Sequence, residues 1–125
     1  MTPIRVVCIE DESEMIDLVS MILSREGYEV IGAAGGLHGL QVVEDVQPGL
    51  VLLDLMMPDL DGWEVYQRLK SNPKTTDLPI IVITARAQSI DKILGLHIAK
   101  VDDYITKPFA PSELLASVQK VLSKR

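Results

Sequence analysis

The stretch Leu50-Val51-Leu52-Leu53-Asp54 decides the fold of this chain, because it is apolar at every position except the last. A strand with apolar side chains on both faces is typical of a parallel sheet that helices cover on each side. A carboxylate at the end of such a strand has no packing role. The stretch therefore predicts a buried central strand that presents an acid at its carboxyl end.

Apolar runs of strand length alternate with segments of helical period on both sides of this strand. We expect strands at residues 4–9, 28–33, 50–54, 79–84 and 101–106, and helices at about 15–23, 37–46, 63–70, 89–98 and 111–122. Asp61 is expected to cap the third helix, with Glu64 completing a capping box. The alternation predicts one α/β domain over residues 1–125, with a parallel sheet between two layers of helices.

The composition narrows the class of protein further. The chain of 125 residues has a net charge of −6, and this acidic balance disfavours direct binding to nucleic acid. Its apolar runs are too short to span a membrane. The single cysteine, Cys8, cannot form an internal disulfide, which favours a reducing compartment. These features predict a cytoplasmic domain that acts on neither membranes nor nucleic acid.

Polar side chains follow four of the predicted strands: Glu10 and Asp11, then Asp54, Thr84 and Lys107. The carboxyl ends of parallel strands meet at one edge of a sheet, so we expect these groups to lie together. Gathered carboxylates raise one another's pKa unless a cation is present. Mg²⁺ prefers oxygen ligands of this kind, and the pattern therefore predicts a magnesium site.

The same residues predict phosphoryl chemistry. Asp54 is a plausible nucleophile, because carboxylates form aspartyl phosphates. Thr84 can donate a hydrogen bond to a phosphoryl oxygen, and Lys107 can place a positive charge beside another. Each residue also has a structural interpretation: Asp11 could cap the first helix with Glu14 completing a capping box. The combination of groups at four strand ends favours the functional interpretation.

Four segments, in this order, resemble the receiver domain of bacterial two-component response regulators. They are VVCIEDE (6–12), LLDLMMPDLDG (52–62), PIIVITA (79–85) and DDYITKPF (102–109). Each segment alone is weak evidence, whereas the four together on alternating strands and helices are specific. The resemblance covers essentially the whole chain and implies a flavodoxin-like (βα)₅ fold, with a five-stranded parallel sheet in the order 2-1-3-4-5.

The resemblance also implies roles for individual residues. Asp54 is the implied phosphoacceptor, in contact with Thr84 and Lys107. The implied Mg²⁺ ligands are Glu10, Asp11, Asp54 and the backbone carbonyl of Met56. Thr84 and Tyr104 are the implied switch residues, and the Lys107-Pro108 bond is expected to be cis. The implied partner is a sensor histidine kinase or a phosphotransfer protein, and homodimers through the fourth helix, fifth strand and fifth helix are common in the family.

Two departures and two competing functions qualify this expectation. Glu10 is longer than the aspartate often found there, so its contact to the metal is expected to run through water. Ala110 lacks a capping side chain at the start of the last helix.

An aspartate-nucleophile phosphatase would need a second acid where Met56 stands, so we expect a signalling switch and not an enzyme. Apolar Met56 also predicts slow self-dephosphorylation. The remaining alternative is a pseudo-receiver that binds partners without phosphorylation.

Overall fold

The computed structural model describes residues 2–85 and 101–124. Its strands are β1 (Arg5–Ile9), β2 (Glu29–Ala33), β3 (Leu50–Asp54), β4 (Ile80–Thr84) and β5 (Asp103–Thr106). Its helices are α1 (Ser13–Ser24), α2 (Gly36–Val46), α3 (Gly62–Ser71) and α5 (Pro111–Ser123). The helix expected at about 89–98 lies outside the described residues.

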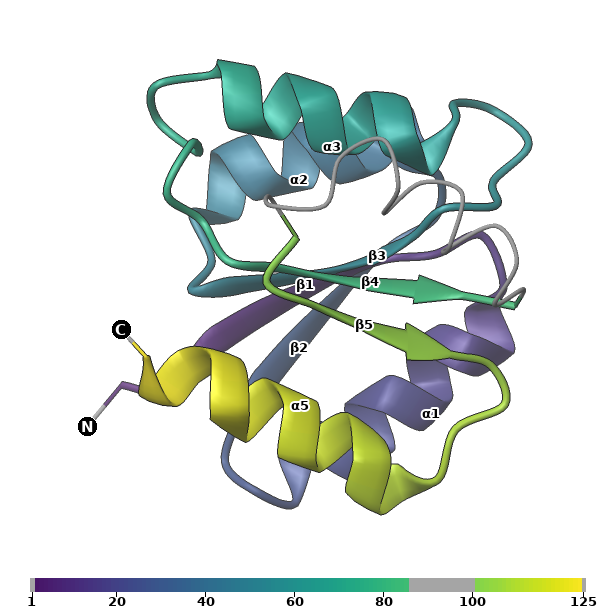
Figure 1. The fold of residues 1–125 in the computed structure, drawn as a ribbon, viewed down its shortest axis with the longest axis vertical. Helices are drawn as coiled ribbons and strands as arrows, with labels where there is room; N and C mark the ends of the chain where they lie inside the picture. The colour runs from purple at the N-terminus through teal and green to yellow at the C-terminus, as the bar shows by residue number, and fades with distance from the viewer. Residues whose placement is uncertain (1, 86–100, 125) are drawn as a thin grey trace.

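The strands form one parallel sheet in the order β2-β1-β3-β4-β5, which confirms the flavodoxin-like arrangement. Helices α1 and α5 cover one face of the sheet, and α2 and α3 cover the other (Figure 1). Strand β3 lies at the centre and is buried at all five positions. The prediction of a strand covered on both faces is therefore confirmed.

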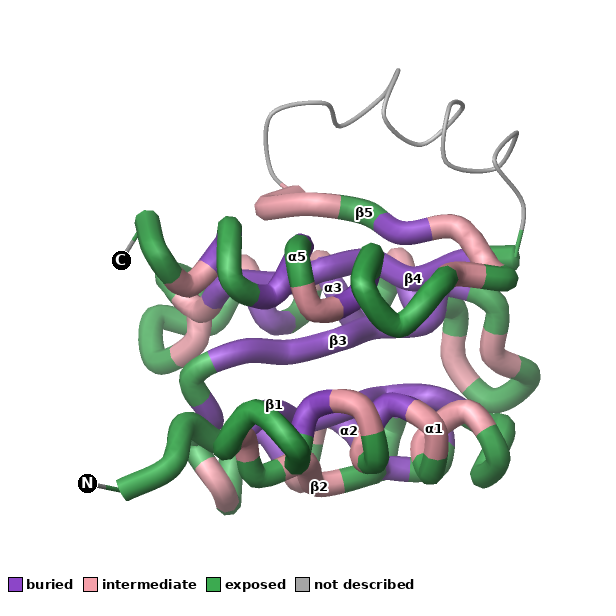
Figure 2. Tube along the Cα trace, turned by 90° about the horizontal axis from the view of Figure 1, so that it is seen from below, coloured by how far each residue is buried: buried purple, intermediate pink, exposed green. Residues whose placement is uncertain are grey.

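Two aliphatic cores hold the layers together, one on each face of the sheet. In β1, Val6 and Cys8 belong to the core under α1 and α5, whereas Val7 and Ile9 belong to the core under α2 and α3. Figure 2 shows strands β1, β3 and β4 buried along nearly their whole length, whereas the helices alternate buried and exposed positions. Burial raises the pKa of the Cys8 thiol to about 12, so it behaves as a core residue.

Several predicted boundaries differ from the structure. Helix α1 begins at Ser13, with Glu12 at the N-cap position, so the interpretation of Asp11 as a helix cap is wrong. Strand β5 begins at Asp103 and not at 101, because the side chain of Asp102 accepts the N–H of Ile80 at 2.8 Å and closes the sheet edge there.

The helix caps confirm part of the expectation. Asp61 caps α3 by accepting the N–H of Trp63 at 2.8 Å. The second half of the predicted capping box is wrong, because Glu64 pairs instead with Arg68 at 3.3 Å one turn later. None of the helices in the two described ranges has the length and apolar character that crossing a membrane requires.

Candidate functional site

Register brings two acids together at the carboxyl edge of the sheet. Ile9 of β1 pairs with Leu53 of β3, so the residues that follow them, Glu10 and Asp54, lie on adjacent strands at the same level. Glu10 is 2% exposed and Asp54 is 3% exposed. Burying a carboxylate is unfavourable unless a cation or hydrogen-bond donors compensate it. This pair therefore requires a positive group nearby.

Lys107 supplies that positive charge from the other half of the sheet. Thr106 of β5 pairs with Thr84 of β4, and the N–H of Lys107 donates to the Thr84 carbonyl at 2.8 Å. The Lys107 ammonium lies 2.7 Å from Glu10 Oε2 and 3.5 Å from Asp54 Oδ2. The expectation that Lys107 lies beside Asp54 is confirmed. Its shorter contact, however, is to Glu10.

The electrostatics of this group favour an added cation. Burial raises the pKa of Glu10 to about 7, and the hydrogen bond from Lys107 only partly opposes this effect. Burial disfavours the Lys107 ammonium, but the bond to Glu10 and the charge of Asp54 outweigh it and raise the lysine pKa. Two buried acids therefore share one ammonium, and further positive charge would relieve their repulsion.

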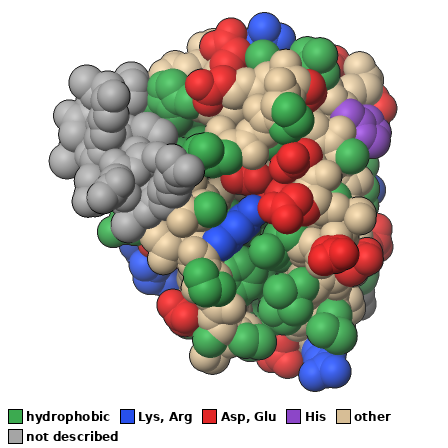
Figure 3. Space-filling view, turned by 90° about the vertical axis from the view of Figure 1, so that its right-hand side faces the viewer, with side chains coloured by type: hydrophobic (Ala, Val, Ile, Leu, Met, Phe, Trp, Pro, Cys, Tyr) green, Lys and Arg blue, Asp and Glu red, His purple; other side chains and the backbone are tan. Residues whose placement is uncertain are grey.

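The acidic edge extends outward to the start of α1. Carboxylate oxygens of Glu10, Asp11 and Glu12 lie within 4.8 Å of one another, and Asp11 and Glu12 are exposed. Figure 3 shows acidic side chains gathered around a basic one on this face of the molecule. An all-oxygen donor set of this kind is the type that Mg²⁺ prefers.

Glu12 was not among the predicted site residues, yet its Oε1 lies 3.7 Å from the Lys107 ammonium. The available signal was its place in the acidic run of residues 10–12. That run continues the acidic pair into the first helix cap. A charge contact across 95 positions of sequence is visible only after folding, because nothing local links Glu12 to β5.

The loop after Asp54 is held against the strand that precedes it. The N–H of Met56 donates to Asp54 Oδ1 at 3.0 Å, which orients the carboxylate. The N–H of Gly62 donates to the Leu55 carbonyl at 3.2 Å and closes the loop. A Cβ at Gly62 would lie 2.3 Å from the Asp54 carbonyl oxygen. Only glycine permits this close approach.

The two predicted switch residues differ in their surroundings. Thr84 is fully buried, and its hydroxyl has no hydrogen-bond partner among the described residues. A buried hydroxyl without a partner is unfavourable, so this group is available to a ligand. Tyr104, on β5, is 46% exposed. The Lys107-Pro108 bond is cis, as the resemblance implied.

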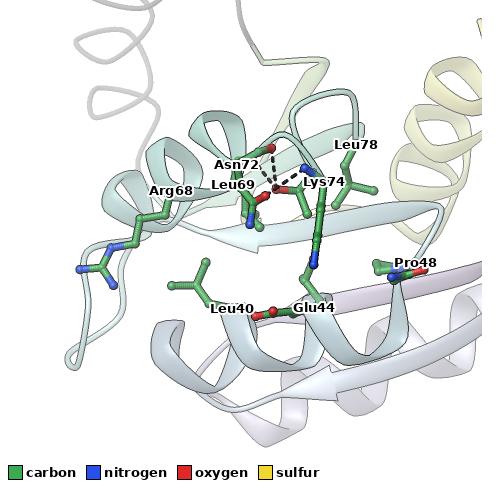
Figure 4. A pocket seen from close by; sticks show the side chains of 11 residues that line it. Leu40, Glu44, Pro48, Arg68, Leu69, Asn72, Lys74 and Leu78 are labelled. Atoms are coloured by element: carbon green, nitrogen blue, oxygen red, sulfur yellow. Dashed lines mark hydrogen bonds between the residues drawn. The ribbon is translucent and has the colours of Figure 1, made fainter.

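A hollow of about 470 Å³ lies elsewhere, between α2, α3 and the loop that follows α3 (Figure 4). Apolar Leu40, Leu69 and Leu78 line it together with charged side chains such as Glu44 and Lys74. None of the acids at the sheet edge lines this hollow. The residues predicted to carry the chemistry therefore lie at the carboxyl edge of the sheet and do not line this hollow.

Comparison with known proteins assigns the family. The sequence model of the family described as "Response regulator receiver domain" matches residues 6–119. The chain is 42% identical over 120 residues to the DNA-binding dual master transcriptional regulator RpaA of Synechocystis sp. The alignment covers 96% of this chain and 49% of that protein. It is 39% identical over 119 residues to the phosphate regulon transcriptional regulatory protein PhoB of Pseudomonas aeruginosa, covering 95% of this chain and 52% of PhoB. The chain thus spans about half the length of these relatives.

Solved structures agree with the sequence relatives. The response regulator receiver domain protein (CheY-like) from Methanospirillum hungatei superposes with a TM-score of 0.87 at 30% identity, covering 98% of this chain and 95% of that one. The chemotaxis response regulator CheY4 of Vibrio cholerae has a TM-score of 0.86 at 27% identity, covering 96% and 99%. Because the family match runs through nearly the whole chain, we conclude that it belongs to the response regulator receiver domains of two-component signalling systems.

Proposed function

We propose that this receiver accepts a phosphoryl group on Asp54 from a phosphohistidine of a partner kinase or phosphotransfer protein, in a reaction that depends on Mg²⁺. The observation that carries the proposal is the buried Asp54 carboxylate, 3.5 Å from the Lys107 ammonium at the carboxyl edge of the sheet. Family membership supports it, because the family model matches residues 6–119, a range that includes Asp54.

The chemical step follows from the residues present. An oxygen of the Asp54 carboxylate forms a bond to phosphorus as the P–N bond of the phosphohistidine breaks. The electron pair of that bond stays on the imidazole nitrogen, which takes up a proton. The Lys107 ammonium balances charge on one phosphoryl oxygen, and the Thr84 hydroxyl, which has no partner among the described residues, donates to another.

The residues present fit a magnesium ion. Asp11, Asp54 and the backbone carbonyl of Met56 would hold it, with Glu10 contributing through water. Bound there, Mg²⁺ supplies positive charge beside the phosphoryl oxygens. Glu10 has a second task in this proposal, because its bond to Lys107 at 2.7 Å holds the ammonium beside Asp54.

The output follows from a change of shape. A hydrogen bond from Thr84 to the phosphoryl group draws that side chain toward Asp54, and Tyr104 moves inward behind it. This rearrangement alters the surface of β5 and α5, where Asp103 accepts hydrogen bonds from Ser117 and Lys120. That surface is also the described part of the proposed homodimer face. RpaA and PhoB are named as transcriptional regulators, so we infer that control of transcription is the output this receiver serves.

The test uses acetyl phosphate and Mg²⁺ with detection of the phosphorylated protein by mass spectrometry. The wild-type domain is expected to gain one phosphoryl group, and Asp54→Asn is expected to gain none. Asp61→Asn is the matched control, because it makes the same chemical change in the loop that follows Asp54 while asparagine still caps α3. Phosphorylation of Asp54→Asn would falsify the assignment. A wild-type domain that gains no phosphate would instead support the phosphorylation-independent interaction module.

A further inference from the structure

We propose that Asp59 is a positioning residue that ties the loop after the phosphoacceptor to the N-terminus of α2, and thereby couples occupancy of the Mg²⁺ site to that helix. The inference rests on the proposed function and deepens it. Asp59 lies five residues after Asp54, in the loop that carries the Met56 carbonyl. No side chain of α2 itself accepts a hydrogen bond from the first N–H groups of that helix.

The contact is made by both carboxylate oxygens of Asp59. Oδ1 accepts the N–H of Gly36 at 3.1 Å, and Oδ2 accepts the N–H of Leu37 at 3.2 Å. The first N–H groups of a helix lack partners within the helix, and a negative charge there is favourable. These hydrogen bonds lower the pKa of Asp59. The loop therefore supplies the cap that α2 lacks.

The glycine pair at residues 35–36 makes room for this approach. Gly35 has φ of 99°, and a Cβ there would lie 3.0 Å from each oxygen of the Asp59 carboxylate. A Cβ at Gly36 would lie 2.9 Å from the Cβ of Leu60, the next residue of the loop. Both positions thus favour glycine because the loop packs closely on them.

Asp59 supplies the hydrogen bonds that fix the tip of the loop. At the base, Met56 is bonded to Asp54, and Gly62 is bonded to Leu55. Between these anchors, Asp59 and Leu60 contact the start of α2, and Met57 and Leu60 pack against the core under α2 and α3. A loop with a free tip would sample more positions of the Met56 carbonyl. The conformational entropy lost when Mg²⁺ orders such a loop would then reduce the affinity for the ion.

The experiment measures Mg²⁺ affinity through the fluorescence of Trp63, the single tryptophan, which lies in the first turn of α3 next to the loop. Asp59→Ala is expected to raise the Mg²⁺ dissociation constant about three- to tenfold. Asp59→Asn keeps one acceptor oxygen and should recover part of the loss. In the wild type, Mg²⁺ should slow hydrogen exchange at the amides of Gly36 and Leu37, because coupling is reciprocal, and in Asp59→Ala it should not.

Asp61→Ala is the matched control. It removes a carboxylate that accepts an N–H at 2.8 Å at the start of α3, so it breaks a helix cap in the same loop without touching α2. Its Mg²⁺ dissociation constant should change less than about twofold, the scale expected when only a local cap is lost. Unchanged affinity in Asp59→Ala, or an equal loss in Asp61→Ala, overturns the role of Asp59 and leaves the proposed function intact. Failure of the wild type to bind Mg²⁺ overturns both.

Discussion

Replacing Lys107 by methionine is the sharpest test of the electrostatics at the sheet edge. Methionine keeps the length of the side chain and removes the ammonium that lies 2.7 Å from Glu10 and 3.5 Å from Asp54. Both carboxylates then remain buried without a cation. Removing one member of a buried ion pair typically lowers the free energy of unfolding by about 3–5 kcal/mol. Because the Lys107 side chain is 12% exposed, we expect the lower end, about 3 kcal/mol at pH 8.

The effect should depend on pH with a definite sign. The pKa of Glu10 in the folded protein is raised to about 7, and losing the hydrogen bond from Lys107 raises it further. The folded state then binds more protons than the unfolded chain, so stability falls as pH rises from the ordinary value of 4.5 through the raised pKa. At pH 6 a proton on Glu10 neutralises one buried carboxylate, which removes about 1 kcal/mol of the difference between the two proteins, so the expected loss is about 2 kcal/mol.

The assay is thermal and urea unfolding of both proteins at pH 6 and pH 8, with and without Mg²⁺. For a domain of this size, the loss at pH 8 corresponds to a decrease in Tm of about 10 °C. Mg²⁺ should restore more stability to the variant than to the wild type, since it supplies the missing positive charge.

Lys120→Met is the control for this experiment. It removes an ammonium at 2.9 Å from Asp103, but that lysine is 54% exposed, so the loss should stay below about 1 kcal/mol. If Lys107→Met loses no more stability than Lys120→Met at pH 8, the buried acids do not depend on Lys107, and the reasoning fails.

Three further predictions concern single side chains. Thr84→Val removes a buried hydroxyl without a partner among the described residues, so the free energy of unfolding in urea should rise by about 1 kcal/mol. Phosphorylation by acetyl phosphate should slow, and an unchanged phosphorylation rate would contradict the role of Thr84. Met56→Asn should speed hydrolysis of the phosphorylated protein about tenfold, which is the scale of one hydrogen bond to the attacking water. Mass spectrometry would follow the loss of the phosphoryl group with time, and equal decay of both proteins would count against this prediction. In the wild type, burial raises the pKa of Asp103, but the bonds from Ser117 and Lys120 outweigh this and lower it, so Ser117→Ala should raise that pKa in a carboxyl NMR titration. The stability deficit of Ser117→Ala should then be full above the ordinary value of 3.8 and shrink as pH falls below it; a deficit independent of pH would contradict this cause.

Much of the fold was predictable because its signals are local. The apolar run before Asp54 predicted a strand covered on both faces, and the structure buries all of it. The alternation of strand and helix patterns predicted the parallel sheet. The rule that the carboxyl ends of parallel strands meet at one edge predicted which side chains lie together. Proximity along the chain sets these patterns, so the sequence alone carries them. The boundaries were less accurate, because contacts such as that of Asp102 with Ile80 decide where a strand begins.

What the sequence by itself determined is therefore the type and order of the elements and the residue types that meet at the carboxyl edge. Only the tertiary structure decided the partners within that group: Lys107 bonds Glu10 more closely than Asp54, Glu12 joins the acidic edge, and Asp59 caps a helix that begins 23 positions earlier. The physical reason is the distance along the chain over which each kind of interaction acts. Periodicity and capping act over a few residues, whereas ion pairs and loop contacts depend on strand register, which the whole sheet sets at once.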